Sequence, residues 1–339
     1  MADSDRALLR SVPGLARVPH FGFGTYPTPV EELHLSDAAP AFRGRAWVKR
    51  EDLSAAAVGG NKVRKLEYLF GEARARGADS FVTIGGLASN QCLAAAYHGR
   101  AIGLDAHLVL FPQHLTEATR RRFRATCAIA STLTYVRWAN LTPVAALAVR
   151  ARLARRGKRP YSIPPGATSM TGILGSAEVG LELAEQSHAG ELEMPDAVFT
   201  ALGSGGTAAG LALGLQLGGL APDVVGVRVY PLPVSSQAWV RLLARRGHRR
   251  ITRLAGNATH DFDASRITVR AGYLGAGYAA PTESGSAAEA VGKELGVPLD
   301  STYTAKAFAA FMDAAKSPPY RDKNLVFLAS YDPRLPSSM

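Results

Sequence analysis

The sequence predicts an α/β fold in which mainly parallel sheets are flanked by helices. Seven short apolar runs alternate along the chain with nine helical stretches. The apolar runs are continuous and rich in β-branched or aromatic residues, as is typical of strands that are covered on both faces. Strands that alternate with helices indicate βαβ units and parallel sheets. The length of 339 residues suggests about two domains.

The expected elements follow an irregular, proline-rich start that ends at Pro29. Strands are expected at 46–49, 80–84, 106–111, 132–136, 197–201, 224–229 and 325–328. Helices are expected at 62–76, 91–100, 116–128, 143–156, 171–186, 207–217, 236–245, 284–295 and 305–315. The connection 162–171 contains Pro164, Pro165 and Gly166, and it predicts a hinge between two α/β lobes. Small molecules bind in such clefts, at the carboxyl ends of strands.

The composition is that of a globular protein. Apolar residues make up 47% of the chain and charged residues 20%, which excludes disordered and fibrous classes. No window holds the roughly 18 uninterrupted apolar residues of a membrane span, and the N-terminus has no apolar core long enough for a secretory signal. Cys92 and Cys127 form no CxxC pair, which argues against a disulfide framework or a zinc site. We therefore expect a cytoplasmic protein with no metal and no membrane partner.

The net charge of +11 raises the question of a nucleic-acid partner. Arginines gather at 120–124, 155–159 and 245–250. Each cluster lies where a helix is expected to finish, where cations are favoured, and Gly157 and Gly247 are expected to cap two of these helices. No aromatic residues interleave with the arginines as a stacking platform for bases requires. We expect solvated helix ends and no nucleic-acid partner.

The first segment whose residues suit a catalytic role is the run GGNK at 59–62. Its two glycines allow a tight turn, and Asn61 is expected to cap the helix that follows. Lys62 then lies in the first helical turn, where the helix dipole, Arg64 and Lys65 disfavour its charged form. A neutral amine is the nucleophile that Schiff-base chemistry requires. Lys65 can fill the same role on chemistry alone.

The second segment is the run GGLASNQ at 85–91, which follows a predicted strand. The backbone amides of Ser89, Asn90 and Gln91 are expected to point from a helix N-terminus into the cleft, where they form a seat for a carboxylate. Ser89 and Asn90 can also hydrogen-bond a substrate and a phenolic oxygen. A helix cap without any further role explains the same residues.

The third segment is the run GSGGTAAG at 203–210. Its glycine amides, with the hydroxyls of Ser204 and Thr207, predict a phosphate seat at a helix start. The run also matches the dinucleotide pattern G-x-G-x-x-A. That alternative needs an acidic residue at the end of the next strand, but this strand ends without one and carries Arg228. The missing acidic residue weakens the case for a nicotinamide cofactor but does not exclude it. A glycine turn that serves only helix packing is a further alternative.

The fourth segment comprises Tyr278 and the run STYTAK at 301–306. Tyr278 and Tyr303 can stack on a ring or orient a leaving group, and Thr304 lies at another transition from loop to helix. Taken singly, either tyrosine is also explained as a core or interface aromatic.

Together these segments resemble the pyridoxal-phosphate (PLP) enzyme family of 1-aminocyclopropane-1-carboxylate (ACC) deaminase and D-cysteine desulfhydrase. The resemblance begins at YPTP (26–29), includes KRED (49–52) and GGNKVRKLE (59–67), and continues in order to the Tyr303 segment. It implies the tryptophan-synthase-β-like fold, type II, with two open twisted, mainly parallel sheets flanked by helices. We expect a larger PLP-binding domain at 1–64 plus 165–339, a smaller α/β domain at 65–164, and the active site between them.

The resemblance implies a role for each matched residue. Lys62 matches the lysine that holds PLP covalently and later moves protons at Cα, and Asn90 matches the contact to the PLP ring hydroxyl. Ser89, with the amides of Asn90 and Gln91, matches the loop that binds the substrate carboxylate. The residues that match the phosphate loop are Ser204, Gly205, Gly206 and Thr207. The family is typically a cytoplasmic homodimer.

Tyr278 and Tyr303 match the two active-site tyrosines of the family, and the residue after Tyr303 distinguishes its branches. ACC deaminases usually carry Glu where this chain has Thr304, the group that faces the pyridine nitrogen. A hydroxyl makes the ring a weaker electron sink than a carboxylate does, but one adequate for a good β leaving group such as a thiol. Thr304 therefore resembles the desulfhydrase branch and argues against ring opening of ACC.

Two departures from the family concern the substrate side. The Gln that usually precedes the Ser-Asn pair is Ala88 here, and Cys92-Leu93 follows Gln91. The usual C-terminal His-(Thr/Leu)-Gly-Gly is replaced by the run ASYD at 329–332. We expect Ser330 to stand in for the threonine, and the next two residues, Tyr and Asp, to add bulk and charge near the pocket.

The sequence therefore predicts a PLP-dependent lyase that acts on a small amino acid. The Lys62 amine removes the α-proton, a β-substituent leaves, and an α-keto acid and ammonia are released. D-cysteine or a related β-substituted alanine is the expected substrate; ACC deamination and β-replacement are alternatives within the family. A nicotinamide-dependent oxidoreductase leaves Lys62 unexplained. A catalytically inactive member would bind PLP and release no product.

Overall fold

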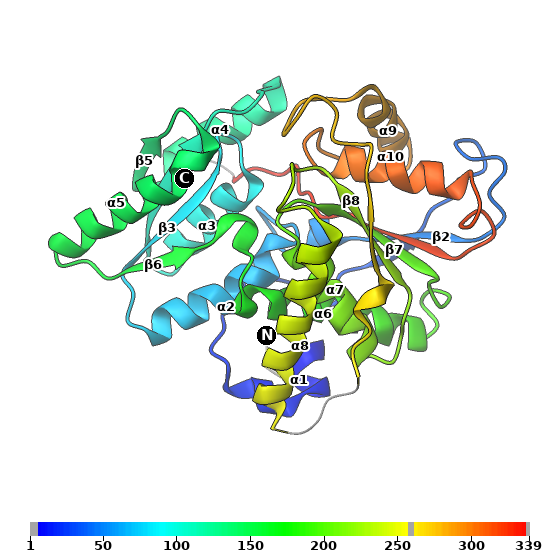
Figure 1. Cartoon of the computed structure of the whole chain (residues 1–339), viewed down its shortest axis with the longest axis horizontal. Helices are drawn as coiled ribbons and strands as arrows, with labels where there is room; N and C mark the ends of the chain where they lie inside the picture. Colours follow the sequence, from blue (N-terminus) through cyan, green and yellow to red (C-terminus); the bar gives the residue numbers. More distant parts are fainter. Residues whose placement is uncertain (1–5, 257–260, 337–339) are drawn as a thin grey trace.

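The computed structural model describes residues 6–256 and 261–336, and within them the strands form two sheets. The larger sheet has the order β1-β2-β10-β7-β8-β9 and the smaller the order β5-β4-β3-β6. Neighbouring strands run parallel except for the antiparallel pair β1 and β2. Figure 1 shows the two sheets beside each other, with α2 and α6 between them. The predicted fold, two mainly parallel sheets flanked by helices, is confirmed.

The strands are short and mostly buried. Those of the larger sheet are β1 (Val30–Glu32), β2 (Ala46–Lys49), β7 (Ala197–Leu202), β8 (Asp223–Arg228), β9 (Ile267–Arg270) and β10 (Leu325–Leu328). Those of the smaller sheet are β3 (Ser80–Gly86), β4 (Asp105–Phe111), β5 (Thr132–Tyr135) and β6 (Pro160–Ile163). Every predicted strand is present. The strands β1, β6 and β9 were not predicted, and all three lie at sheet edges.

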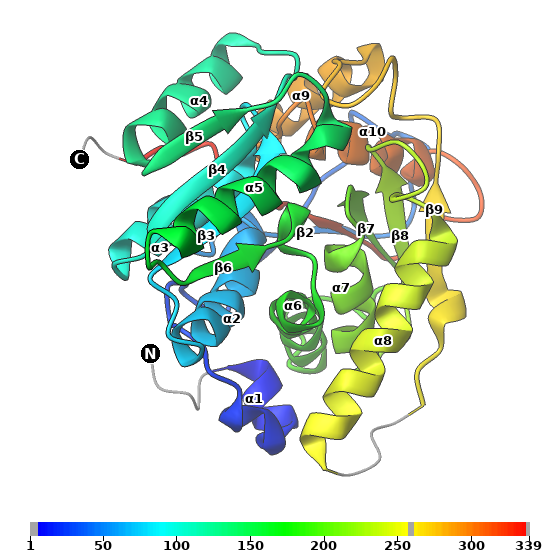
Figure 2. The same ribbon diagram turned by 60° about the vertical axis from the view of Figure 1, so that its left-hand side comes forward.

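Helices cover both faces of each sheet. They are α1 (Ala7–Ser11), α2 (Lys62–Ala75), α3 (Asn90–Ala101), α4 (Glu117–Ile129), α5 (Thr142–Arg155), α6 (Met170–His188), α7 (Gly206–Leu217), α8 (Gln237–Ala255), α9 (Glu283–Glu294) and α10 (Thr304–Ala315). Alternate side chains of β7 divide the core: Val198 packs in the cluster of α6, α7 and α8, while Phe199 packs in that of α9 and α10. Figure 2 shows α6, α7 and α8 packed side by side.

The arginine clusters differ from their predicted setting. The cluster at 155–159 lies at the end of α5, and Gly157 has the left-handed φ of a helix cap. Gly247 is not a cap, because α8 continues to Ala255 and the glycine lets that helix approach Leu213 and Ile173 closely. The cluster at 120–124 lies inside α4, and its Arg122 is only 4% exposed.

The two sheets are consistent with the predicted two domains, but they do not define where one domain ends and the other begins. The strands of the smaller sheet all lie within residues 80–163, so the boundaries 1–64 plus 165–339 and 65–164 stay a proposal. The predicted hinge at 162–171 begins inside β6 and continues through a short 3-10 turn, Pro165–Ala167. In the parts of the chain that the structure describes, no helix has the length and apolar character needed to span a bilayer.

A buried ionic cluster ties α2 to the larger lobe. Arg64 on α2 donates to Glu51 and to Glu182 on α6, and Lys49 on β2 donates to the same Glu182. All four side chains are at most 5% exposed. The cluster fixes the start of α2, and with it Lys62, against the larger sheet.

Close packing of α6 on α7 predicts a sensitive glycine. A Cβ on Gly214 would overlap the carbonyl oxygen of Ala177 on α6, whereas a Cβ on Gly22 would meet nothing within 4 Å. Gly214→Ala is therefore expected to lower the free energy of unfolding by about 1–3 kcal/mol, as overpacking does. Urea denaturation of the two variants measures this difference. An equal midpoint for Gly214→Ala and Gly22→Ala would contradict it.

Candidate active site

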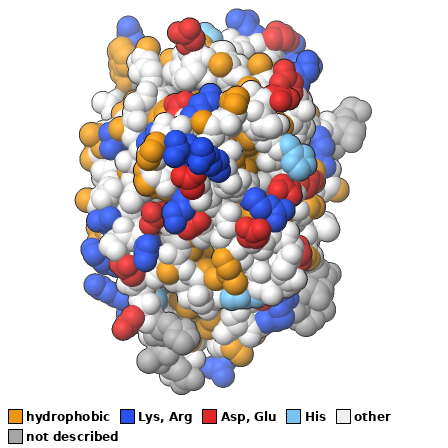
Figure 3. Space-filling model, turned by 90° about the vertical axis from the view of Figure 1, so that its right-hand side faces the viewer, with side chains coloured by type: hydrophobic (Ala, Val, Ile, Leu, Met, Phe, Trp, Pro, Cys, Tyr) orange, Lys and Arg blue, Asp and Glu red, His pale blue; other side chains and the backbone are white. Residues whose placement is uncertain are grey.

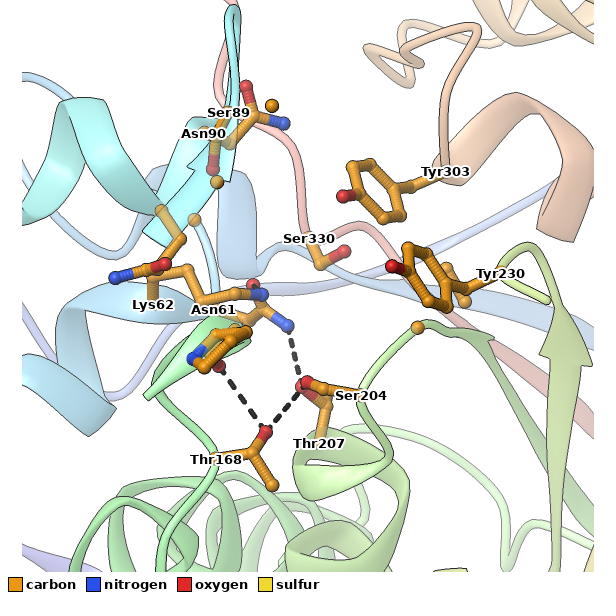
Figure 4. A pocket seen from close by; sticks show the side chains of 18 of the residues that line it. Asn61, Lys62, Ser89, Asn90, Thr168, Ser204, Thr207, Tyr230, Tyr303 and Ser330 are labelled. Atoms are coloured by element: carbon orange, nitrogen blue, oxygen red, sulfur yellow. Dashed lines mark hydrogen bonds between the residues drawn. The ribbon is translucent and has the colours of Figure 1, made fainter. Parts of the chain in front are cut away.

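A cavity of about 350 Å³ lies where the carboxyl ends of the parallel strands of both lobes meet. Its walls come from the loops after β3, β7 and β8, from the start of α2 and from the C-terminal segment that follows β10. The predicted site residues that line it are Lys62, Ser89, Asn90, Gln91, Ser204, Gly205, Thr207, Tyr278, Tyr303, Thr304 and Ser330. Gly206, the remaining predicted residue, begins α7 at the edge of this cavity. Residues distant in the sequence thus converge on one cavity (Figure 4).

Lys62 is the first residue of α2 and extends from a strained turn. Gly60 has a φ of +95°, and a Cβ there would lie 2.7 Å from the carbonyl oxygen of Ser330, so only glycine fits this approach. Asn61 precedes the helix, but its side chain makes no cap hydrogen bond, contrary to the prediction. Asn61 Oδ1 instead accepts from Lys62 Nζ at 2.8 Å, and its Nδ2 donates to Thr207 Oγ1 at 2.9 Å.

Burial lowers the pKa of Lys62 to about 8, while Asp300 acts in the opposite direction. From the sequence, this shift was expected to come from the helix dipole together with Arg64 and Lys65. That explanation is wrong for Arg64, because Glu51 and Glu182 neutralise its guanidinium. At neutral pH a usable fraction of the Lys62 amine is therefore uncharged.

Lys65, the alternative amine, lies in a different environment. Burial, and next the charge of Lys62, lower its pKa well below the usual value. Its Nζ donates to the carbonyl oxygen of Gly166 at 3.4 Å, and the side chain is not among those that line the cavity. The geometry therefore favours Lys62 as the amine that a bound molecule meets.

The loop after β3 presents the start of α3 to the cavity. Ser89 is the N-cap of α3 and its hydroxyl accepts from the amide of Cys92 at 3.3 Å, so the predicted cap and the predicted binding residue coincide. Gln91 turns its Nε2 toward Thr83 Oγ1 at 2.8 Å. The amides of Asn90 and Gln91 lie in the first turn, where they have no acceptor within the helix.

The glycine turn after β7 forms the opposite wall. Gly205 has a φ of +90° and precedes α7, whose first amides are free to bind an anion. Ser204 Oγ lies 2.7 Å from Thr168 Oγ1 (Figure 4). A Cβ on Gly166 would overlap the Ser204 hydroxyl, and one on Gly206 would lie 2.6 Å from Thr168 Oγ1. Glycine at these two positions is therefore required for the close approach of the two hydroxyls to the turn.

Tyr278 and Tyr303 lie together at one side of the cavity. Their hydroxyls are 2.7 Å apart, and burial raises the pKa of both, so each phenol keeps its proton near neutral pH. Tyr230, two residues after the end of β8, packs edge-on against Tyr278 with ring centroids 5.2 Å apart. Tyr230 was not among the predicted site residues, although its position after a parallel strand is the signal that identified the other segments.

Thr304 begins α10 and is joined to Asp300. Its hydroxyl accepts from the Asp300 amide at 2.7 Å and donates to the Asp300 carboxylate at 2.8 Å. Burial raises the pKa of Asp300, with the hydrogen bonds from Thr304 acting against the shift. Asp300 lines the cavity and was also not predicted.

The C-terminal segment lines the cavity as the sequence predicted, but its charge is neutralised. Tyr331 and Asp332 both border the cavity. The Asp332 carboxylate accepts from the Gly59 amide at 2.7 Å and pairs with Arg334 at 2.8 Å. Asp332 therefore holds the glycine turn before Lys62 and adds little net charge to the cavity.

Comparisons with known proteins decide the family. The family model described as pyridoxal-phosphate dependent enzyme matches residues 23–330. The chain belongs to this family. It is 32% identical to the D-cysteine desulfhydrase of Serratia proteamaculans, with 91% of this chain and 92% of that protein covered. It is 34% identical to the D-cysteine desulfhydrase of Salmonella typhimurium, with the same coverage. The predicted resemblance is confirmed, and PLP is the cofactor rather than a nicotinamide.

Solved structures agree with the assignment to the PLP family. The structure of an ACC deaminase homologue superposes with a TM-score of 0.81 at 28% identity and covers 97% of this chain and 95% of its own. A threonine deaminase of T.th. superposes with a TM-score of 0.61 at 19% identity, covering 98% and 99%, and supports the type II fold alone.

The residues present fit this cofactor. The glycine turn offers amides and hydroxyls for a phosphate, and a Cβ at Gly166 or Gly206 would intrude on the space beside those hydroxyls. Lys62 supplies an amine of lowered pKa in the same cavity, and the neutral phenols of Tyr278 and Tyr303 border it. A phosphate seat and a reactive amine in one cavity are the two attachments that PLP needs.

Proposed function

We propose that this PLP-dependent enzyme is a lyase that removes a β-substituent from a small amino acid and releases an α-keto acid and ammonia. D-cysteine or a related β-substituted alanine is the proposed substrate. The observation that carries the proposal is the convergence of Lys62, the Ser89 loop and the glycine turn on one cavity. The identity to D-cysteine desulfhydrases over most of both chains supports the elimination chemistry.

Each wall of the cavity has a proposed role in holding the reactants. PLP supplies an aldehyde that condenses with amines and a ring that withdraws electrons from Cα. We assign the phosphate to the amides and hydroxyls of residues 204–207, and the ring hydroxyl to Asn90. The helix start at Ser89, with the amides of Asn90 and Gln91, holds the substrate carboxylate. Ser330, which lines the same cavity, is a further proposed substrate contact.

Lys62 is the proposed base at Cα. Its lowered pKa keeps part of the amine neutral near pH 7, so it accepts a proton without first losing one to water. Tyr278 and Tyr303 share a hydrogen bond and retain their protons. A neutral phenol can donate to a departing β-substituent, and the pair is therefore positioned to assist the leaving group.

Thr304 supports elimination rather than opening of the ACC ring. We propose that it faces the pyridine nitrogen; its hydroxyl, already bonded to Asp300, offers no negative charge of its own. ACC deamination stays the second candidate, because the ACC deaminase homologue superposes over nearly the whole chain. β-Replacement is the third.

A panel of amino acids tests the proposal. D- and L-cysteine, D- and L-β-chloroalanine and ACC are incubated with the purified enzyme, and keto acid and ammonia are measured. The expected result is pyruvate and ammonia from one enantiomer of cysteine or chloroalanine. Keto acid from ACC alone would replace the proposal with ACC deamination, and no keto acid from any of them would refute it.

The pKa of Lys62 predicts how cofactor capture depends on pH. The neutral amine is the nucleophile, so the rate at which cofactor-free protein binds PLP covalently is expected to rise with pH and to level off above a midpoint of about 8. Stopped-flow absorbance over a series of pH values measures the midpoint. A midpoint near 10.5, the ordinary lysine pKa, would show that the amine is solvated.

We further propose a cytoplasmic homodimer without a nucleic-acid partner. The two cysteines are free, which suits a reducing compartment. On the face seen in Figure 3, Lys and Arg are interspersed with Asp and Glu instead of forming one basic field. Sedimentation at micromolar concentration, with and without duplex DNA, tests both statements; a monomer or a salt-sensitive DNA complex would contradict them.

A further inference from the structure

Arg122 is a buried cation in the cavity wall that the proposed reaction does not use. It lies on α4 of the smaller lobe, within the arginine cluster expected to be solvated, and it is 4% exposed. It lines the same cavity as Lys62 and Ser89. Its neighbour Arg121 is exposed on the same helix. Burial in the cavity thus distinguishes Arg122 from the rest of the cluster.

The guanidinium of Arg122 has few partners for a buried charge. It donates to the backbone carbonyl of Asp332 at 2.8 Å, lies 4.9 Å from the centre of the Tyr331 ring and interacts with the Tyr331 hydroxyl, so its protein partners are neutral groups. Among residues 6–256 and 261–336, no Asp or Glu side chain forms an ion pair with it. A guanidinium carries five N–H donors, and a buried charge is costly unless it is paired.

Asp300 and Asp332 border the same cavity as Arg122, but neither carboxylate forms an ion pair with it. The Asp332 carboxylate is held by Gly59 and Arg334. Asp300 feels the charge of Arg122, but its Oδ1 accepts from the amide and hydroxyl of Thr304. No carboxylate among the described residues therefore pairs directly with Arg122, which leaves an anion in the cavity as its direct ionic partner.

The cavity has two other anion-binding sites, and each already has a proposed ligand. The glycine turn is assigned to the cofactor phosphate, and the start of α3 to the substrate carboxylate. An amino acid offers one further position that can carry a negative charge, which is its β-substituent. Arg122 is suited to that position because a planar fork of donors matches an oxyanion.

We propose that Arg122 binds an oxyanion on the β-carbon of the substrate, so that the preferred substrates are alanines with an anionic β leaving group. The turnover of such substrates rests on the proposed lyase function, whereas the binding of the oxyanion by Arg122 does not. With serine O-sulfate the Cα–H and Cβ–O bonds break, and the Cβ–O electron pair leaves on sulfate. With one water consumed, the products are pyruvate, ammonium and hydrogen sulfate.

The first test measures binding without turnover. 3-Sulfopropanoate carries the carboxylate and a β-sulfonate but no amine, and 3-(methylsulfonyl)propanoate is its counterpart with a neutral sulfone. Calorimetry on the PLP-loaded enzyme is expected to give tighter binding of the sulfonate. Arg122→Gln should weaken that binding by about 10- to 100-fold, the loss of a charged hydrogen bond, and Arg121→Gln should not change it.

Arg122→Gln retains an N–H donor for the Asp332 carbonyl, which separates charge recognition from a structural tether. If Arg122→Gln fails to fold, Arg122→Lys replaces it, because lysine keeps the charge but lacks the planar fork of donors. Arg122→Lys is expected to weaken the binding of 3-sulfopropanoate by about 3- to 10-fold. Equal affinity for sulfonate and sulfone in the wild type would overturn the inference. An equal loss for both ligands in the variants would show a tether only and would overturn it too.

The second test measures selectivity in turnover. The ratio of kcat/KM for serine O-sulfate to that for O-acetylserine, each as both enantiomers, is expected to fall about 10- to 100-fold in Arg122→Gln. An unchanged ratio, with O-acetylserine still converted, would overturn the inference and leave the lyase proposal standing. Arg122-dependent binding of 3-sulfopropanoate without keto acid from any substrate would sustain the inference while refuting the lyase proposal.

Discussion

Replacing Lys62 by alanine is expected to lower keto-acid release by at least about 10³-fold, since a positioned acid–base group alone contributes about 10²–10⁴-fold. The same substitution removes the amine that meets the cofactor in the cavity. The visible absorption of the lysine-bound cofactor should therefore disappear as well. Steady-state assays and absorption spectra of the purified variant measure the two effects.

Lys65→Met is the matched control for Lys62→Ala. Lys65 is buried, its pKa is lowered well below the usual value, and it lies outside the cavity lining, so an apolar side chain of similar length suits its position. The visible absorption is expected to persist in Lys65→Met. If it persisted in Lys62→Ala and vanished in Lys65→Met, the wrong amine would have been assigned.

Glu182→Gln is expected to have the largest effect on stability. It leaves Lys49 and Arg64 buried without their shared carboxylate, and removal of one partner of a buried ion pair costs about 3–5 kcal/mol. Glu185→Gln on the same helix is the control, because Glu185 pairs with Arg10 at the surface, where such pairs contribute at most about 1 kcal/mol. Urea denaturation of both variants measures the difference, and equal losses would contradict the account.

The same carboxylate predicts how stability depends on pH. Burial alone favours neutral Glu182, but Arg64 and then Lys49 outweigh it and lower its pKa to about 2, below the ordinary 4.5. Lys49 itself has a lowered pKa, because its burial outweighs the charge of Glu182. A lowered carboxyl pKa stabilises the fold above pH 4.5, and this contribution is lost as the pH falls toward 2.

Denaturation of wild type and Glu182→Gln at a series of pH values isolates this contribution. The stability difference between the two proteins is expected to be full at neutral pH and to shrink below about pH 4.5. A difference that stayed constant down to about pH 3 would show that the Glu182 carboxyl has the same pKa in the folded and the unfolded protein, and it would contradict the account.

Much of the fold could be predicted because a central strand is recognisable from its own sequence. Every predicted strand is present, and all of them except the edge strand β5 lie inside a sheet, where strands are continuous apolar runs. The missed strands β1, β6 and β9 are edge strands. β6 begins with Pro160, which an edge tolerates and a sequence reading takes as a break. The early end predicted for α8 has a similar cause, because Gly247 serves helix packing there and does not stop the helix.

The site was predictable wherever a local motif carried it. Lys62, the Ser89 loop and the glycine turn each combine a turn with a helix start, and the structure brings them to one cavity. Arg122 and Asp300 have no such motif. Arg122 reaches the cavity because α4 packs near the C-terminal segment, a contact across 210 positions of the chain. Local sequence patterns do not encode contacts of this length.

Borohydride reduction of the PLP-loaded protein, followed by peptide mass analysis, tests the central claim most directly. Lys62 lines the cavity, and Lys65 does not. The reduced cofactor should therefore be found on Lys62, with Lys65 unmodified. Cofactor mass on Lys65, or on no lysine of α2, would contradict the assignment on which the proposed function depends.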